Sequence, residues 1–221
     1  MDADWSVEAA AEDPVVVVPW PGEPASASPS KAQVSGFVDL RGDPGNKAEN
    51  ANDVAAVDRL PEAVEHPALR QALLRLNDPN GCLRTAKCDV WEIDREEMES
   101  LQTRFDLAPA RYGRGSYVDV LLAEGFAEAG LPAHEDWTRA MVRAAGEMDE
   151  VGESASCAEF IVRPAHVDRA WGYAVTVYVW SVGNDAPSAE EHWTAALGEV
   201  VRAVIQTAPR QHRDTMCATG E

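Results

Sequence analysis

The stretch Trp171–Trp180 constrains the fold of this chain more than any other part of the sequence. It reads WGYAVTVYVW, and β-branched and aromatic residues of this kind favour β-strands. Successive side chains of a strand point to opposite faces, and here both faces are largely apolar. A strand with one face in water would carry charged residues at alternate positions. The pattern therefore predicts a central strand in a sheet that helices cover.

A helix that follows this strand supplies the predicted cover. Ser188–Glu191 has the form of a capping box, and a helical pattern continues over 188–206 until Pro209 ends it. Apolar side chains recur there at helical spacing and form one stripe, made of Trp193, Leu197, Val200, Val201, Val204 and Ile205.

The alternation of side chains in strands and the spacing of apolar residues in helices also predict the other elements. The expected strands are Val15–Val18 as an edge strand, Val34–Leu40, Leu83–Ile93, Tyr117–Leu122, and Cys157–Val162 closed by Pro164. The expected helices span 66–77, the stretch from a capping box at Asp94 to Phe105, and 134–148. Residues 108–115 are expected to form a loop. The core is expected to hold Trp137, Trp171, Trp180 and Trp193.

This order of elements predicts the α+β class, as a two-layer α/β sandwich with a mixed or antiparallel sheet. A chain of 221 residues with 45% hydrophobic content can bury a sizeable core. The predicted division is an acidic, Pro/Ser-rich N-terminal segment at 1–33, a first α+β half at 34–108, a second half at 109–209 and a flexible tail at 210–221.

Two parts of the sequence repeat the order strand, helix, strand. The first holds Gly36–Leu40, His66–Leu73 and Lys87–Trp91, and the second holds Ser116–Val120, His134–Met141 and Cys157–Ile161. Asp39 aligns with Asp119, and Asp89 aligns with Glu159. The recurrence favours a duplicated ferredoxin-like unit based on βαβ. The alternative is a coincidence of short matches at unfixed spacing.

The charge of the chain excludes some classes of partner. The 19 Lys+Arg and 38 Asp+Glu residues give a formal net charge of -19. Such a charge repels nucleic-acid phosphates and anionic lipids, so neither a nucleic acid nor a membrane is an expected partner. The first residues are acidic where a signal peptide is basic, and no apolar run reaches the ~18 residues of a membrane span. We therefore expect a cytoplasmic protein.

The common catalytic and cofactor signatures are missing. The sequence contains no GxGxxG after a strand, no GxxxxGK[ST], no GxSxG and no HExxH. The four cysteines form no CxxC pair, so reduced thiols are expected. Cys88 with His134 or His166 permits a Cys–His nucleophile, but a thiol inside a strand usually serves as a small buried hydrophobe. No cofactor is predicted, and a binding protein is favoured over an enzyme.

Four acidic residues form the candidate site of the alternative interpretation. Phe37-Val-Asp39 and Tyr117-Val-Asp119 repeat an aromatic-Val-Asp pattern, and Asp39 and Asp119 would share a cleft with Asp89 and Glu159 if the halves are related by a pseudo-twofold axis. Paired carboxylates raise one another's pKa and can act as general acid and base or bind a hard cation. The simpler interpretation is that these residues cap loops or face solvent, because no ligand spacing fixes their geometry.

The sequence therefore favours a non-enzymatic acidic binding or interaction protein. Its charge favours a cationic partner such as a basic protein, and self-association is the other use of the same surface. Trp5 and Trp20 lie in the acid-rich N-terminal third, outside the expected core, and are candidates to anchor that segment or a partner. The alternative is a small enzyme or metal-dependent protein with an acidic cleft between the two halves.

Overall fold

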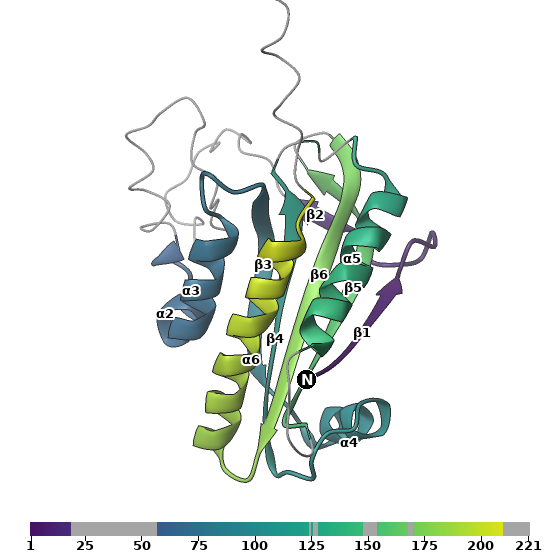
Figure 1. Cartoon of the computed structure of the whole chain (residues 1–221). Coiled ribbons are helices and arrows are strands. Elements are labelled where there is room, and N and C mark those ends of the chain that lie inside the picture. The colour runs from purple at the N-terminus through teal and green to yellow at the C-terminus, as the bar shows by residue number, and fades with distance from the viewer. Residues whose placement is uncertain (19–56, 124, 126–127, 148–153, 168–169, 210–221) are drawn as a thin grey trace, which may run out of the picture.

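The computed structural model describes residues 1–18, 57–123, 125, 128–147, 154–167 and 170–209. These residues form an α+β fold in which one mixed six-stranded sheet packs against helices (Figure 1). The strands are β1 Asp2–Val7, β2 Val16–Val18, β3 Leu83–Glu92, β4 Tyr112–Leu122, β5 Ser156–Val167 and β6 Ala170–Gly183. The helices are α2 Pro61–Glu65, α3 Pro67–Leu76, α4 Arg95–Arg104, α5 Leu131–Gly146 and α6 Ala186–Thr207.

The sheet has the strand order β1-β5-β6-β4-β3, and β2 also pairs with β5. β1 and β2 run parallel to β5, whereas the remaining neighbours are antiparallel. β6 lies between β5 and β4, so the predicted central position of Trp171–Trp180 is confirmed. β4 and β5 flank β6, both antiparallel to it, and α5 connects them in sequence.

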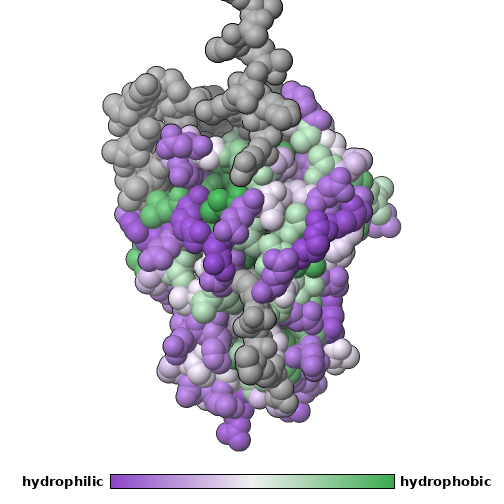
Figure 2. Space-filling model, viewed as in Figure 1, coloured by the Kyte–Doolittle hydropathy of each residue, from purple (hydrophilic) through white to green (hydrophobic). Residues whose placement is uncertain are grey.

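Helices α3, α5 and α6 form a layer on one face of the sheet, with α6 between the other two (Figure 1). Figure 2 shows the molecule from this side, where hydrophilic side chains spread over the surface and surround smaller hydrophobic patches. None of the helices in the described ranges is long and apolar enough to cross a bilayer.

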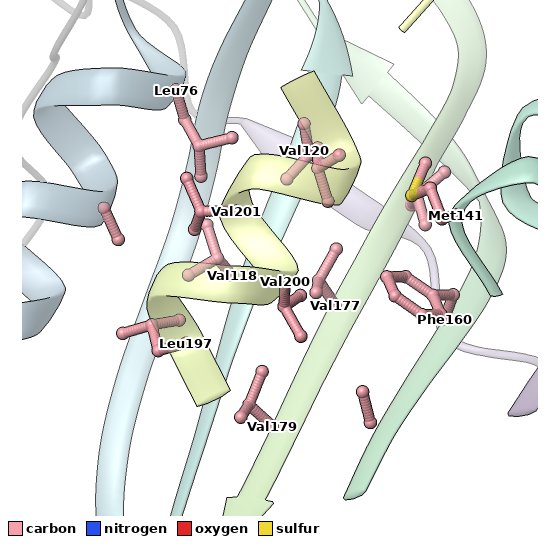
Figure 3. Close-up of a cluster of buried hydrophobic side chains, with 14 of the residues drawn as sticks. Leu76, Val118, Val120, Met141, Phe160, Val177, Val179, Leu197, Val200 and Val201 are labelled. Carbon is pink, nitrogen blue, oxygen red and sulfur yellow. The ribbon is translucent and has the colours of Figure 1, made fainter. Parts of the chain in front are cut away.

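The main core lies between this helix layer and the sheet. Alternate residues of the strands point into it, including Val118, Val120, Phe160, Val177 and Val179 (Figure 3). Helix α6 covers them with Leu197, Val200 and Val201, which confirms the predicted apolar stripe except that Ile205 is 37% exposed. Burying side chains of this size contributes roughly 1.5–3 kcal/mol each. The indole of buried Trp193 also donates a hydrogen bond to Ser116 Oγ at 2.9 Å, which joins α6 to β4.

The N-terminal segment contains a strand that its sequence pattern did not predict. β1 pairs with β5 from Asp2 opposite Cys157 to Val7 opposite Val162. Ala3, Trp5 and Val7 pack against the main core, and the guanidinium of Arg139 lies 4.6 Å from the centre of the Trp5 ring. The placement of Trp5 outside the core was therefore wrong. The predicted valine strand is present as β2.

Two predicted strand boundaries were wrong. β4 begins at Tyr112, so residues 112–115 belong to the sheet and not to a loop. β5 continues through Pro164 to Val167. Proline cannot donate a ladder hydrogen bond. The pairing of β5 with β1 ends at Val162, and its pairing with β2 begins at Ala165. Pro164 therefore lies at a break in the pairing on that side of β5.

Helices α3, α4, α5 and α6 occur where the sequence predicted them, with different ends, whereas α2 was not predicted. α5 starts at Leu131 and ends at Gly146, a few residues before the predicted end. α6 starts at Ala186 because Asp185 is the N-cap and forms a capping box with Ser188, in place of the predicted box Ser188–Glu191. Asp94 caps α4 as predicted and accepts a hydrogen bond from the Glu97 amide.

The predicted core tryptophans are buried except one. Trp137, Trp180 and Trp193 are at most 7% exposed, whereas Trp171 is 63% exposed and lies 4.9 Å from the ring of His166. The predicted strand Val34–Leu40, residue Trp20 and the tail 210–221 fall outside the described residues.

Candidate functional site

The face of the sheet opposite α3, α5 and α6 carries a row of acidic and aromatic side chains, and we call it the second face. Strand register brings one row of side chains across it: Asp89 of β3, Tyr117 of β4, Tyr178 of β6, Glu159 of β5 and Asp4 of β1. The row arises because paired residues of neighbouring strands point to the same side of a sheet. A central sheet that looks apolar along β6 thus bears acids and phenols on one side.

A buried polar network lies beside this row. The Thr176 hydroxyl donates to Oδ1 of Asp119 at 2.6 Å, and it accepts a hydrogen bond from Arg163 Nη1 at 3.2 Å. Arg163 Nε in turn donates to Glu8 at 2.7 Å, just beyond β1. Asp119 and Thr176 are at most 3% exposed. The network links β4, β6, β5 and the end of β1 through side chains alone.

Burial raises the pKa of Asp119. Desolvation raises the pKa of this carboxyl, and the Thr176 hydrogen bond together with the charges of Lys87 and Arg163 only partly opposes that increase. The pKa of the Tyr117 phenol is also raised. Its burial and the nearby carboxylates of Asp119 and Asp89 raise its pKa to about 12, so the side chain stays a neutral hydroxyl.

Glu159 is held in an ion-pair group at the edge of the second face. Arg104, the last residue of α4, donates to both Glu159 oxygens at 2.5 and 2.7 Å and to Asp4 at 3.1 Å. The Glu159 side chain is 8% exposed and that of Arg104 is 43% exposed. Bidentate pairing of this kind fixes geometry as well as charge. It ties α4 to β5 and β1.

Four aromatic rings form a connected group on the second face. Tyr117 and Tyr178 are 5.7 Å apart between ring centres, Trp91 lies 6.4 Å from Tyr117, and Trp180 stacks on Tyr178 at 5.1 Å. The guanidinium of Arg163 lies 5.8 Å from the centre of the Tyr178 ring. Trp91, Tyr117 and Tyr178 are half-buried, so part of each ring reaches the surface.

Glu97 holds the two tryptophans of this group. Its carboxylate accepts hydrogen bonds from the Trp91 indole at 2.9 Å and from the Trp180 indole at 2.9 Å. The side chain therefore does not return to the N-cap of α4, as the predicted capping box required. With Met98, Leu101 and Phe105 it packs α4 onto one end of the second face.

Three of the four predicted site residues share this face. Asp89, Asp119 and Glu159 all point to it, whereas Asp39 lies outside the described residues. The three do not form one cluster, because Tyr117 and Tyr178 separate Asp89 from Glu159 in the cross-strand row. Within the described ranges no group of three His, Cys, Asp or Glu residues is placed to hold a metal ion.

Cys88 is not an activated thiol. Burial, followed by the charges of Glu62, Asp89 and Asp119, raises its pKa to about 12, so a thiolate is rare at neutral pH. Cys88 also points to the helix-covered side, where it packs against the main core. This environment fits the small buried hydrophobe that the sequence favoured over a nucleophile.

The sequence pattern did not identify Arg104, Arg163, Thr176 and Glu97 as parts of the site. Arg163 and Glu159 carried one available signal, because charged residues at alternate positions of an otherwise apolar strand mark a polar face. The partnership of Arg104 with Glu159 spans 55 residues of sequence and has no local signature.

A separate cavity of about 220 Å³ lies at the end of β3 and β4. It is lined by Glu92, Ile93, Arg111, Tyr112, Gly113, Arg114, Ala186 and Ala189. Arg114 is already paired with Glu190 at 2.8 Å, and Glu92 adds an acid to the lining. The cavity therefore shows no consistent charge preference for a ligand.

Comparisons of this chain with protein families, with curated proteins and with solved structures found no match.

Proposed function

We propose that this protein is a non-enzymatic binding protein whose second face receives a cationic partner, such as a basic protein. The supporting observation is the combination of exposed or half-exposed carboxylates with half-exposed aromatic rings on one sheet face. Asp89 is exposed beside Tyr117. At the opposite edge the side chains of Asp4 and Glu8 are 55% and 33% exposed, and they already pair with Arg104 and Arg163 of this chain. Aromatic rings and carboxylates both attract cations.

The net charge of the whole chain also supports a cationic partner. A net charge of -19 raises the rate at which a basic partner arrives and repels nucleic acids, although aromatic sheet faces can also stack bases. Cytoplasmic location remains part of the proposal. Self-association through an acidic face is the less favoured use of this surface, because two copies would bring like charges together.

A matched pair of charge reversals tests the proposal. Asp89→Lys alters the second face, whereas Glu191→Lys makes the same charge change at an exposed position of α6, on the other side of the sheet. Basic proteins captured from a native lysate at low salt should remain bound by the Glu191 variant and be lost from the Asp89 variant. Equal retention by both variants, or capture of no basic protein, would reject the proposal.

The alternative function is a small enzyme or metal-dependent protein that uses Asp119, Asp89 and Glu159, with Asp39 as a further candidate. It is favoured by the raised pKa of buried Asp119, since such shifts often mark functional carboxyls. Melting curves with and without Mg²⁺, Mn²⁺, Ca²⁺ and Zn²⁺ test it. A bound ion at 100 times its Kd adds about 2.7 kcal/mol to the free energy of unfolding. An unchanged Tm with every ion counts against a metal site.

The finer description of the fold is also a proposal. β4, α5, β5 and β6 have the strand–helix–strand–strand order of a ferredoxin-like unit, with β6 between β4 and β5 and with α6 following. β3, antiparallel to β4, occupies the fourth place in that arrangement. The internal duplication rests on sequence alone, since its first strand lies outside the described residues. A structure of 34–40 paired as β4 is paired would support it.

A further inference from the structure

We propose that the paired residues Asp89 and Tyr117 form a binding site for the guanidinium group of an arginine side chain from the basic partner. This inference rests on the proposed function and adds the chemical group that the second face recognises.

The two residues are direct neighbours across β3 and β4. Directly opposed residues of an antiparallel pair have Cβ atoms about 4.5–5.5 Å apart. A planar cation on the Tyr117 ring therefore lies within reach of the Asp89 carboxylate. Asp89 is exposed, and Tyr117 is half-buried. Oδ1 of Asp89 accepts a hydrogen bond from the backbone N–H of Val90 at 2.8 Å, and the remaining lone pairs of the carboxylate can accept guanidinium N–H groups while the ring supports the flat face of the guanidinium.

The local field favours a cation at this position. Burial and then the carboxylates of Asp119 and Asp89 raise the pKa of the Tyr117 phenol, so these two acids favour a positive group at the ring. Lys87, exposed on the same side of β3, is the cation nearest in sequence to this pair. It acts on Asp119, which lies deeper in the sheet than Asp89.

The chain already places arginine on this aromatic group. Arg163 lies over the neighbouring Tyr178 ring while its Nε binds Glu8, so one guanidinium contacts a phenol ring and a carboxylate at the same time. Asp89 and Tyr117 offer the same two chemical groups from the adjacent strands. Trp91, Tyr117 and Tyr178 are 5.7–6.5 Å apart between centres, which leaves no gap for a methylated ammonium between them. A flat group stacked on top is the cation that fits.

The preference for arginine over lysine follows from this geometry. An ammonium is a compact, strongly hydrated charge, whereas a guanidinium is planar, more weakly hydrated and able to bind a carboxylate with two N–H groups. The general attraction of an acidic protein for cations does not distinguish the two. Tighter binding of arginine than of lysine would therefore indicate the guanidinium site.

Titration with hexa-arginine and hexa-lysine peptides tests the inference, with indole and backbone N–H signals followed by NMR. Hexa-arginine should bind the wild-type protein about fivefold more tightly and shift the signals of Tyr117, Asp89 and the Trp91 indole. Asp89→Asn and Tyr117→Leu should each remove most of this preference. Glu191→Gln should leave it unchanged, because that exposed residue of α6 lies on the other side of the sheet.

The results distinguish failure of the guanidinium site from failure of the proposed binding function. Equal binding of both peptides, or equal weakening by Asp89→Asn and Glu191→Gln, would overturn the guanidinium site. The proposed function would survive that result if basic proteins are still lost on Asp89→Lys. Failure of both peptides to bind, together with capture of no basic protein, would overturn the site and the function together. Unchanged backbone spectra in the free variants would show that the fold is intact.

Discussion

The hydroxyl of Thr176 donates a 2.6 Å hydrogen bond to Asp119 in the interior of the sheet, from β6 to its neighbour β4. A carboxylate at such a position usually costs stability unless it is well paired. Here the partners are one hydroxyl and the more distant charges of Lys87 and Arg163, and the net effect is a raised pKa. The site therefore holds an acid at some cost to folding.

Asp119→Asn should increase the free energy of unfolding at pH 7. The amide oxygen can still accept the Thr176 hydrogen bond, and no charge has to be buried. Because the native pKa is raised, the native state retains its proton at a pH where the unfolded state has lost it. The wild-type protein should thus lose stability as pH rises from about 3.9 through the native pKa.

Urea denaturation between pH 4 and pH 8 measures this effect. The Asn variant should lack the decrease that the wild-type protein shows in that window. Asp136→Asn is the control, because the Asp136 side chain is 80% exposed on α5. A less stable Asn variant at pH 7 would mean that the charges of Lys87 and Arg163 outweigh desolvation.

Glu97→Ala should destabilise the protein by about 2–4 kcal/mol. The substitution removes the shared acceptor of two indole N–H groups, and hydrogen bonds to charged groups contribute roughly 1.5–3 kcal/mol each. Glu97→Gln keeps one acceptor oxygen and should cost less. Chemical denaturation gives the values, and Glu96→Gln at the exposed neighbouring position should change stability by no more than about 0.5 kcal/mol. Similar losses for Glu96→Gln and Glu97→Ala would contradict the role of the indole contacts.

His134 should make the protein sensitive to mild acid. Burial lowers the pKa of its imidazole. The Gly130 carbonyl, 3.1 Å from Nδ1, and the nearby Tyr173 backbone only partly oppose this decrease. Below pH about 6.5 the His134 imidazole is protonated in the unfolded chain but stays neutral in the native state. The free energy of unfolding therefore decreases as pH falls from about 6.5 through the native pKa. His134→Gln should flatten the stability profile between pH 7 and pH 5. An unchanged slope in this variant would show that another group is responsible.

The sequence predicted the elements whose pattern is local and long. β6 was recognisable because its apolar and aromatic residues run almost without a break, and α6 because its stripe spans several turns. β1 was missed because Asp2, Asp4 and Glu8 resemble an acidic tail. The alternation of Ala3, Trp5 and Val7 was a signal that Asp4 and Ser6 partly masked.

The candidate site was only partly predictable for a related reason. The sequence identified Asp89, Asp119 and Glu159 as acids within strands, and all three lie on one face. Their partners come from distant parts of the chain: Arg104 from the end of α4 and Thr176 from β6. Such pairings depend on strand order and register, which single-strand patterns do not specify.

Gly115 should be required for the position of Trp91. Gly115 and Trp91 are directly paired across β4 and β3, and a Cβ at Gly115 would lie 2.6 Å from the indole ring. Gly115→Ala should push the ring away from Glu97 and cost about 1–3 kcal/mol, the usual range for overpacking. Gly198→Ala is the matched control, since nothing lies within 4 Å of its Cβ position and alanine favours a helix interior. It should stabilise the protein by about 0.5–1 kcal/mol. Chemical denaturation gives the opposite signs, and the indole N–H signal of Trp91 should move only in the Gly115 variant. A stable Gly115 variant with an unmoved indole signal would show that the two strands can separate enough to admit a methyl group.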